Sequence, residues 1–486
     1  MKSFYSLLFI LVALFGFQGC KSDSETVSMQ KQIVKLEVVQ KIYDAQQPWR
    51  INTKETARNA LVLSNQKLIT TAEFLSDATV IRVQKEGKGN KFEARVAWIS
   101  YPLNLALISV EETSFWHGLH EANLSDDAPA IGASRIWRWQ NGILESWHAE
   151  INQIQVQATE MSPINHVFAN AFSEIPSAGW CEVVTQGSQV VGLTTSSADK
   201  KLSVIPSRLL LDLLEHQKND PKFEIGFFPF YWQTTENSQN AKRLNFPGTP
   251  QGVFITQVDP TTPEANVLKV DDLLLEINGM TIESNGDYKD PVFGSINLEN
   301  LAVREGIAGS TIHFKIWRQG AEKNVQMTLP AFRYERSKVP DFRFDEVPEY
   351  MIVGGLVFMP LTSQYLRAFG DQWRTAAPFR LMYHTLEPTL SEKEKIVILS
   401  GVLPDPYNLG YSEYRFLTVD SVNDEKVQTL KEMEQALQKN KGEFHKITFL
   451  LGRGPRQAIL DAKTLEEANQ RILKKFSIPT DRVILR

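Results

Sequence analysis

The sequence is poor in the residues on which most disulfide, metal and nucleotide sites depend. It holds only two cysteines and eight histidines among 486 residues. The histidines are scattered, and the nearest pair, His117 and His120, has no cysteine or acidic cluster at ligand spacing. The Gly-Arg-Gly stretch at 452–454 lies in a hairpin pattern, not between a strand and a helix. We therefore expect no metal and no cofactor.

An excess of positive charge is also absent. Lysine and arginine number 52 against 57 aspartates and glutamates, for a formal net charge of −5. The chain contains neither a basic block nor an arginine-rich helical pattern. The sequence therefore does not indicate binding to nucleic acid or binding to a membrane through a polybasic patch.

Long apolar runs are missing except at the N-terminus. Lys2 is followed by an apolar run from Phe4 to Phe17, about 14 residues, which is short for a bilayer span and typical of a signal peptide. The run ends in Phe17-Gln18-Gly19-Cys20, which resembles the cleavage motif of bacterial lipoproteins with Phe in place of the usual Leu. An ordinary signal peptide with a chance cysteine is the alternative.

The lipoprotein resemblance implies that residues 1–19 are removed and that Cys20 is the lipidation site. Acyl chains contribute about 0.8 kcal/mol per buried CH₂, so the anchor would be nearly permanent. Lys21 at the next position implies the outer membrane, facing the periplasm, while the acidic stretch 21–25 leaves the cell surface open. With Cys20 lipidated, Cys181 has no disulfide partner.

Three blocks follow a polar segment (20–45) that we interpret as a tether. From about 46 to 220, short β-like runs separated by turns predict an all-β barrel or sandwich. A helical pattern over 202–220, opened by Pro206, closes this block. The blocks 221–335 and 345–462 each mix strands with a short helix, with turns at Asn278-Gly279 and Gln319-Gly320. Residues 463–486 predict an amphipathic helix and a tail.

Three stretches in the first block carry the frame of a trypsin-like serine protease without its reactive residues. They are KLITTAEFL (67–75), YPLNLALISV (101–110) and IPSAGWCEVVTQGSQVVGL (175–193). The positions of histidine, aspartate and serine hold Glu73, Asn104 and Gly179. We therefore expect no catalytic residues and no enzymatic activity.

The whole order resembles the HtrA/Deg family, and most closely the plant-type Deg proteases. The resemblance is carried in the third block by YMIVGGLVF (350–358), by VILSGVL and NLGY (397–411), and by the stretch Ile478 to Arg482. It implies a mainly β protein with α+β modules: a trypsin-like double β-barrel (46–220), two PDZ domains (221–335 and 345–462) and a C-terminal helix (463–486).

In active members of this family the histidine takes the serine proton, and the aspartate orients that histidine. Gly179 has no side chain to give a proton, and the mature chain has no histidine before His117. Two nearby residues, Ser177 and Cys181, are alternative candidates for the nucleophile. Ser177 is better interpreted as a turn residue, and Cys181 as a small buried core residue.

The PDZ resemblance implies binding of proteins or peptides as an added strand, with backbone N–H groups of an apolar loop holding the terminal carboxylate. The residues that match this loop are Ile225, Gly226, Phe227 and Phe228 in the first domain, and Gly354, Gly355, Leu356, Val357 and Phe358 in the second. Pro229 removes a backbone donor beside the first loop. In the second domain, the alternative interpretation is that these residues form a strand that only packs in the core and binds no peptide.

These features indicate an inactive adaptor or chaperone-like subunit of the cell envelope that binds proteins. Two alternatives stay open: a regulatory subunit of an active HtrA-type protease, and a protease with a rearranged nucleophile.

Overall fold

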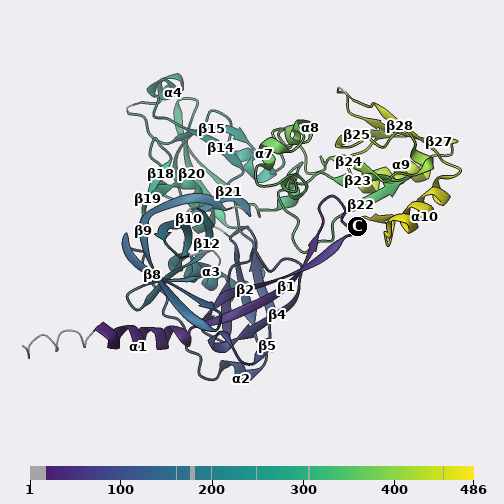
Figure 1. Cartoon of the computed structure of the whole chain (residues 1–486). Coiled ribbons are helices and arrows are strands. Elements are labelled where there is room, and N and C mark those ends of the chain that lie inside the picture. The colour runs from purple at the N-terminus through teal and green to yellow at the C-terminus, as the bar shows by residue number, and fades with distance from the viewer. Residues whose placement is uncertain are drawn as a thin grey trace, which may run out of the picture. The chain divides into compact units, whose positions relative to one another are not determined.

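The computed structural model describes residues 18–159, 161–175, 181–198, 200–247, 249–304, 307–452 and 454–485 (Figure 1). The chain forms two compact units. The first comprises residues 1–40, 55–257 and 267–332, and the second comprises 41–54, 258–266 and 333–486. The signal peptide expected at 1–19 and the side chain of Cys20 lie outside the described part, although the backbone of α1 (Gln18–Gln30) is helical.

The first unit begins with a seven-stranded antiparallel sheet in the order β5-β4-β1-β2-β3-β7-β6. Its core gathers apolar side chains from most of these strands, such as Leu36, Leu68 and Ile108. The strands are β1 (Ile33–Tyr43), β2 (Ile51–Leu63), β3 (Lys67–Thr70), β4 (Ala78–Gln84), β5 (Lys91–Glu93), β6 (Arg95–Ser100) and β7 (Leu105–Ser109), followed by the short helix α2 (Thr113–Trp116).

The interpretation of residues 20–45 as a tether was wrong, because β1 lies inside this sheet between β2 and β4. Val34, Leu36 and Val38 alternate along β1 and are fully buried or nearly so. The polar residues between them complete the alternation that is typical of a half-buried strand, which the interpretation of 20–45 from its overall polar composition overlooked. One of them, Glu37, is paired with Lys35 and Lys91.

A closed barrel of six strands follows in the order β10-β13-β12-β11-β8-β9. Its strands are β8 (Gly132–Gln140), β9 (Ile143–Thr159), β10 (Ser162–Ser173), β11 (Val183–Gln186), β12 (Gln189–Ala198) and β13 (Lys201–Pro206). Helix α3 (Ser207–Asn219) begins directly after Pro206, the residue expected to open it, and the first residues of the 202–220 pattern belong to β13. Leu202 and Val204 point into the barrel, and Pro206 is still extended (φ −64°, ψ 143°), so the helix starts after it.

The remainder of the first unit is a six-stranded sheet, β14-β15-β16-β20-β21 with β17 on β16, and a small two-stranded sheet. The turn at Asn278-Gly279 (φ 47° and 79°) and the hairpin over Gln319-Gly320 confirm the two predicted turns. The elements are β14 (Phe230–Thr234), α4 (Ser238–Arg243), β15 (Val253–Val258), β16 (Leu273–Ile277), β17 (Met280–Thr281), β18 (Asp287–Asp290), β19 (Gly294–Asn297), α5 (Leu301–Arg304), β20 (Thr311–Arg318) and β21 (Ala321–Thr328).

The second unit is built on an eight-stranded sheet in the order β28-β27-β25-β24-β23-β22-β29, with β26 on β25. The strands are β22 (Tyr350–Val353), β23 (Leu356–Pro360), β24 (Val397–Val402), β25 (Leu417–Val422), β26 (Glu425–Lys426), β27 (Phe444–Phe449), β28 (Gln457–Asp461) and β29 (Arg482–Val483). The helices are α6 (Ser363–Arg367), α7 (Trp373–Ala376), α8 (Phe379–Met382), α9 (Leu430–Lys439) and α10 (Leu465–Phe476).

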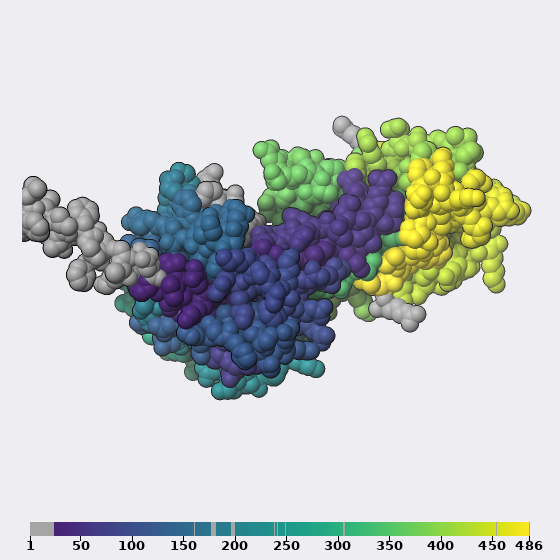
Figure 2. Space-filling model, turned by 60° about the horizontal axis from the view of Figure 1, so that its bottom comes forward, coloured from purple at the N-terminus to yellow at the C-terminus, as the bar shows by residue number. Residues whose placement is uncertain are grey.

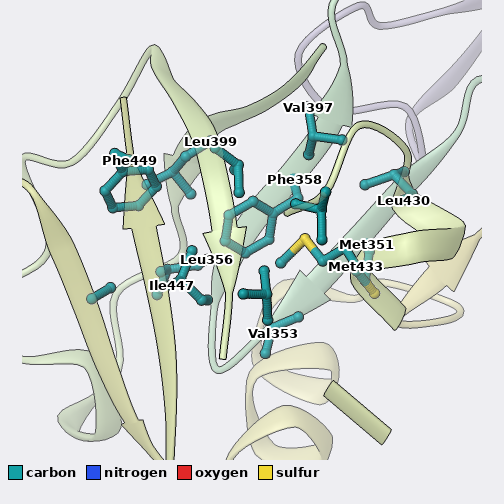
Figure 3. Packing of buried hydrophobic residues seen from close by; sticks show 14 of the residues in the cluster. Met351, Val353, Leu356, Phe358, Val397, Leu399, Leu430, Met433, Ile447 and Phe449 are labelled. Atoms are coloured by element: carbon teal, nitrogen blue, oxygen red, sulfur yellow. The ribbon is translucent and has the colours of Figure 1, made fainter. Parts of the chain in front are cut away.

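Two apolar clusters lie in this second unit. One contains Met351, Phe358 and Met433, which point toward one another in Figure 3. The other contains Tyr350, Ile352 and Leu381, and Trp49 from the loop between β1 and β2 packs against it. The Trp49 and Tyr350 rings meet edge to face with centroids 5.4 Å apart.

The expected boundary at 462 was too early. Leu465 of α10 packs on the first of these clusters, and Leu473 and Phe476 pack on the second. The amphipathic helix that the sequence predicted is therefore part of the domain that precedes it.

Candidate functional site

Asn104 occupies the aspartate position of the protease frame and is almost fully buried. It stands between β6 and β7 in the left-handed region (φ 54°), which asparagine tolerates better than most residues. Its Oδ1 accepts hydrogen bonds from the backbone N–H groups of Ala72 (2.8 Å) and Glu73 (2.9 Å). Its Nδ2 donates to Thr195 Oγ1 of the second barrel at 2.5 Å. The amide therefore holds the turn after β3 and links the seven-stranded sheet to the closed barrel.

Glu73 occupies the histidine position, in the turn after β3. Thr71 Oγ1 donates to Glu73 Oε1 at 2.7 Å, while Glu73 Oε2 is buried without a hydrogen-bond partner in the part of the chain described. Burial raises the pKa of Glu73 from 4.5 to about 7, against the opposing effects of the Thr71 hydroxyl and the Arg58 cation. The Arg58 guanidinium lies over the Phe74 ring, 3.7 Å from its centroid.

Cys181 lies in the same neighbourhood, since its thiol interacts with Thr70 and Glu73. The residue is fully buried, and its backbone is left-handed (φ 56°) with its N–H donating to Thr194 O at 2.8 Å. Burial raises the pKa of the thiol to about 12. A cysteine nucleophile needs the thiolate, so this geometry favours the interpretation of Cys181 as a core residue.

Gly179 and Ser177 lie outside the described residues, which resume at Cys181. The structure therefore brings together Glu73, Asn104 and Cys181 from the predicted set. Sequence reasoning missed Arg58 and Thr195. Arg58 lies in a mostly exposed stretch of β2, so its position in the sequence carries no signal of a role at this centre.

The first predicted peptide loop, Ile225 to Phe228, runs into β14 at one end of its sheet. Ile225 and Gly226 form isolated antiparallel bridges with Ile307 and Ala331. The Phe228 ring stacks on Phe230 with centroids 5.3 Å apart and meets Phe314 edge to face. The loop thus presents half-buried aromatic rings beside a strand that pairs with β15 and ends the sheet order.

The second predicted peptide loop is built differently from what the sequence suggested. Gly354 and Gly355 (φ 58° and 89°) form a two-residue turn between β22 and β23, and Leu356, Val357 and Phe358 are buried in β23.

The polar groups of this turn are already engaged. Gly354 N–H donates to Asn469 Oδ1 at 2.7 Å, and Asn408 Nδ2 donates to Gly354 O at 2.8 Å. Strand β23 pairs with β22 on one side and β24 on the other, so it has no edge to which a peptide can add. The assignment of peptide binding to Gly354–Phe358 was therefore wrong, and the core alternative fits these residues.

The described residues contain no group of histidine, cysteine or acidic side chains that could hold a metal ion. Within the same ranges, no helix is long and apolar enough to cross a membrane.

Comparisons with known proteins agree with this architecture. A PDZ domain family model matches residues 339–483. The mitochondrial Do-like protease 3 of Arabidopsis thaliana is 24% identical over 463 residues, covering 89% of this chain and 76% of the relative. Do-like protease 13 of the same plant is 24% identical over 482 residues, covering 97% and 93%.

Among solved structures, a serine-to-alanine variant of the HtrA-type protease AlgW, solved with a decapeptide, superposes with a TM-score of 0.51 at 14% identity. The match covers 64% of this chain and 97% of that one, and it shows the fold. With a mainly β architecture, a C-terminal PDZ domain and Do-like relatives along most of its length, the chain is similar to HtrA/Deg-type proteases, including the plant Do-like proteases.

Proposed function

We propose that this protein is a catalytically inactive HtrA/Deg-type adaptor that binds other proteins. The observation that carries the proposal is the chemistry at the three triad positions, which hold Glu73, Asn104 and Gly179. A serine protease needs a nucleophile, a base within hydrogen-bond reach of it, and a group that orients the base. Glu73 could accept a proton, but Gly179 has no side chain to give one, and the Asn104 amide is no substitute for the aspartate that orients the base.

The contacts of Asn104 support the same conclusion. Its amide oxygen holds two backbone N–H groups and its amide nitrogen donates to Thr195, so both ends of the side chain are engaged in structure. Cys181 is an unsuitable substitute nucleophile, because a thiol with a pKa of about 12 is protonated at neutral pH.

Peptide binding is proposed for the first PDZ domain. Strand β14 ends its sheet, and the Phe228 and Phe230 rings lie at the start of that strand. An extended peptide can add to such an edge through backbone hydrogen bonds. The HtrA-type neighbour was solved with a decapeptide, which supports this mode of binding for the family fold. We further propose a lipid anchor at Cys20 in the outer membrane, on the periplasmic face.

Titration of the full chain with a library of peptides having free C-termini tests the binding function. We expect binding in the micromolar range that Phe228→Asp weakens at least tenfold, because the charge replaces an aromatic wall of the site. Phe444→Asp is the matched control, since Phe444 is an exposed ring in the second unit. Failure to bind any peptide below millimolar concentration, or equal loss in both variants, would contradict the assignment.

Mild crosslinking in cells, followed by purification, distinguishes the adaptor role from the role of a regulatory subunit. Recovery of envelope proteins other than proteases supports the adaptor. Recovery of an active HtrA-type protease as the main partner would support the alternative role as a regulatory subunit.

A further inference from the structure

The outer edge of β22 in the second unit is closed by the chain itself. Residues 480–485, here called the tail segment, lie along β22, and the C-terminal end is seen beside that strand in Figure 1. Val483 pairs with Tyr350 and Arg482 pairs with Met351. Ile352 N–H donates to Asp481 O at 2.7 Å. The tail segment therefore acts as an added antiparallel strand.

Strand β22 needs such a cover because it is buried on both faces. Met351 and Val353 belong to one apolar cluster, which Figure 3 shows, and Tyr350 and Ile352 belong to the other. Side chains alternate between faces along a strand. Accordingly, Ile484 packs on the first cluster and Val483 on the second. An uncovered edge of this kind is a template for another strand.

Polar contacts select the sequence and register of the segment that covers β22. Arg482 Nη1 donates to Glu434 Oε1 of α9 at 2.7 Å. Leu485 N–H donates to Glu349 Oε1 at 3.0 Å, and the Tyr350 hydroxyl donates to Thr480 O at 3.0 Å. The Glu434 carboxylate thus recognises a basic side chain, while the Glu349 carboxylate and the Tyr350 hydroxyl bind backbone groups and fix the register of the segment.

The tail segment is held more weakly than the elements around it. Its strand β29 is two residues long, and residues 481–484 are only half-buried. Its ion pair with Glu434 is partly open to solvent, with 39% of the Arg482 side chain exposed, so screening weakens it. Short elements with few buried apolar contacts open locally at the lowest cost.

The segment can leave without unfolding α10. Helix α10 ends at Ser477 in the left-handed conformation (φ 55°), which turns the chain, and Ile478 is buried in the second cluster. These two residues anchor the chain before the tail segment begins. The yellow residues of α10 and the tail segment lie at the surface in Figure 2, where a partner can reach them.

We infer that the β22 edge is a strand-acceptor site, which the tail segment closes and a partner protein opens by displacing it. The partner supplies an extended segment with a basic residue followed by consecutive apolar residues, as in the sequence Asp-Arg-Val-Ile-Leu of the tail segment. This inference rests on the proposed protein-binding function but concerns a different site from the first PDZ domain.

Binding of the peptide TDRVILR, labelled with fluorescein, to the full chain and to a chain ending at Pro479 tests the inference. We expect the shortened chain to bind the peptide at least tenfold more tightly than the full chain, because its acceptor edge is open. The Arg→Glu peptide TDEVILR should bind the shortened chain at least tenfold more weakly. Glu434→Lys in the shortened chain should reverse this preference.

Other outcomes would overturn the inference. If the shortened chain loses its fold by circular dichroism, the segment is an integral strand and not a displaceable one. If it stays folded and does not bind TDRVILR, β22 is not an acceptor. If the full chain instead forms dimers that the shortened chain does not, the segment is exchanged between copies and the partner assignment fails. Phe228→Asp should keep the tenfold difference in TDRVILR binding between the shortened and the full chain, which separates this site from the one proposed for the first PDZ domain.

Discussion

At the scale of single residues, the amide of Asn104 carries three hydrogen bonds in a buried position. Asn104→Ala leaves the N–H groups of Ala72 and Glu73 without their acceptor and places a Cβ-only residue at φ 54°. We expect a loss of about 2–4 kcal/mol in the free energy of unfolding, measured by urea denaturation.

Asn141→Ala is the matched control for that measurement. Asn141 has a similar left-handed backbone (φ 51°) but is exposed in a turn. It should lose only about 1 kcal/mol, the cost of the backbone conformation. Equal losses in the two variants would show that the buried amide contributes little.

The buried carboxyl of Glu73 makes stability depend on pH. Its pKa is raised to about 7 in the folded chain from 4.5, so the folded state holds the proton over this interval and the unfolded state does not. The stability that this group contributes is complete below about pH 4.5 and is lost as pH rises toward 7. Glu73→Gln should remove this decline and raise the free energy of unfolding at pH 8 by about 1–3 kcal/mol.

Denaturant unfolding at pH 5, 6, 7 and 8 checks this dependence. Asp424→Asn, at an exposed turn of the second unit, is the control for general charge effects. A Glu73→Gln curve parallel to that of the unaltered chain would contradict the raised pKa.

The sequence frames placed Glu73 and Asn104 correctly as neighbours, because both frames include the strands that bring them together. They did not reveal Arg58 or Thr195. The contacts of these two residues join segments far apart in the chain, and a local sequence pattern does not predict such contacts.

At the scale of elements, the two glycines between β22 and β23 are constrained by what surrounds them. A Cβ on Gly355 would lie 2.3 Å from Asn408 Nδ2 and 2.6 Å from Leu403 O, and its φ is 89°. Gly355→Ala should therefore lose about 3 kcal/mol or more of stability, because neither neighbour can move freely.

Gly410→Ala is a close control for the Gly355 variant. Gly410 has nearly the same backbone (φ 88°), and a Cβ there meets nothing within 4 Å. It should lose only about 1–2 kcal/mol. Thermal or urea unfolding of both variants checks the comparison, and a Gly355→Ala variant as stable as Gly410→Ala would contradict the crowded turn.

Element prediction succeeded where turn chemistry is local and failed where packing decides. The Asn278-Gly279 and Gln319-Gly320 turns follow directly from residues that adopt positive φ. Strand β1 was missed because residues 20–45 were interpreted from their overall polar composition, although Lys35 and Glu37 alternate with buried apolar residues as in a half-buried strand. The Gly354-Gly355 loop resembled a peptide site, yet the partners that fill it, Asn408 and Asn469, are distant in sequence.

At the scale of the whole molecule, the mainly β fold and the C-terminal PDZ domain were predicted from the sequence, since the last block has its own motif. The boundaries of the two compact units do not coincide with the boundaries of the sequence blocks. The block expected to be the first PDZ domain belongs to the same unit as the seven-stranded sheet and the closed barrel, while residues 41–54 of the β1–β2 hairpin belong to the second unit. Which surfaces remain available for binding is set by this packing and not by the motifs.

The central claim is that the chain binds proteins without cutting them. Incubation of the purified full chain with casein, with and without a fluorophosphonate probe, tests it most directly. We expect neither peptide release nor probe labelling, and the same result for Cys181→Ala. Cleavage that the probe abolishes would contradict it by showing a serine nucleophile, and cleavage that Cys181→Ala abolishes would contradict it by showing that the buried thiol is reactive.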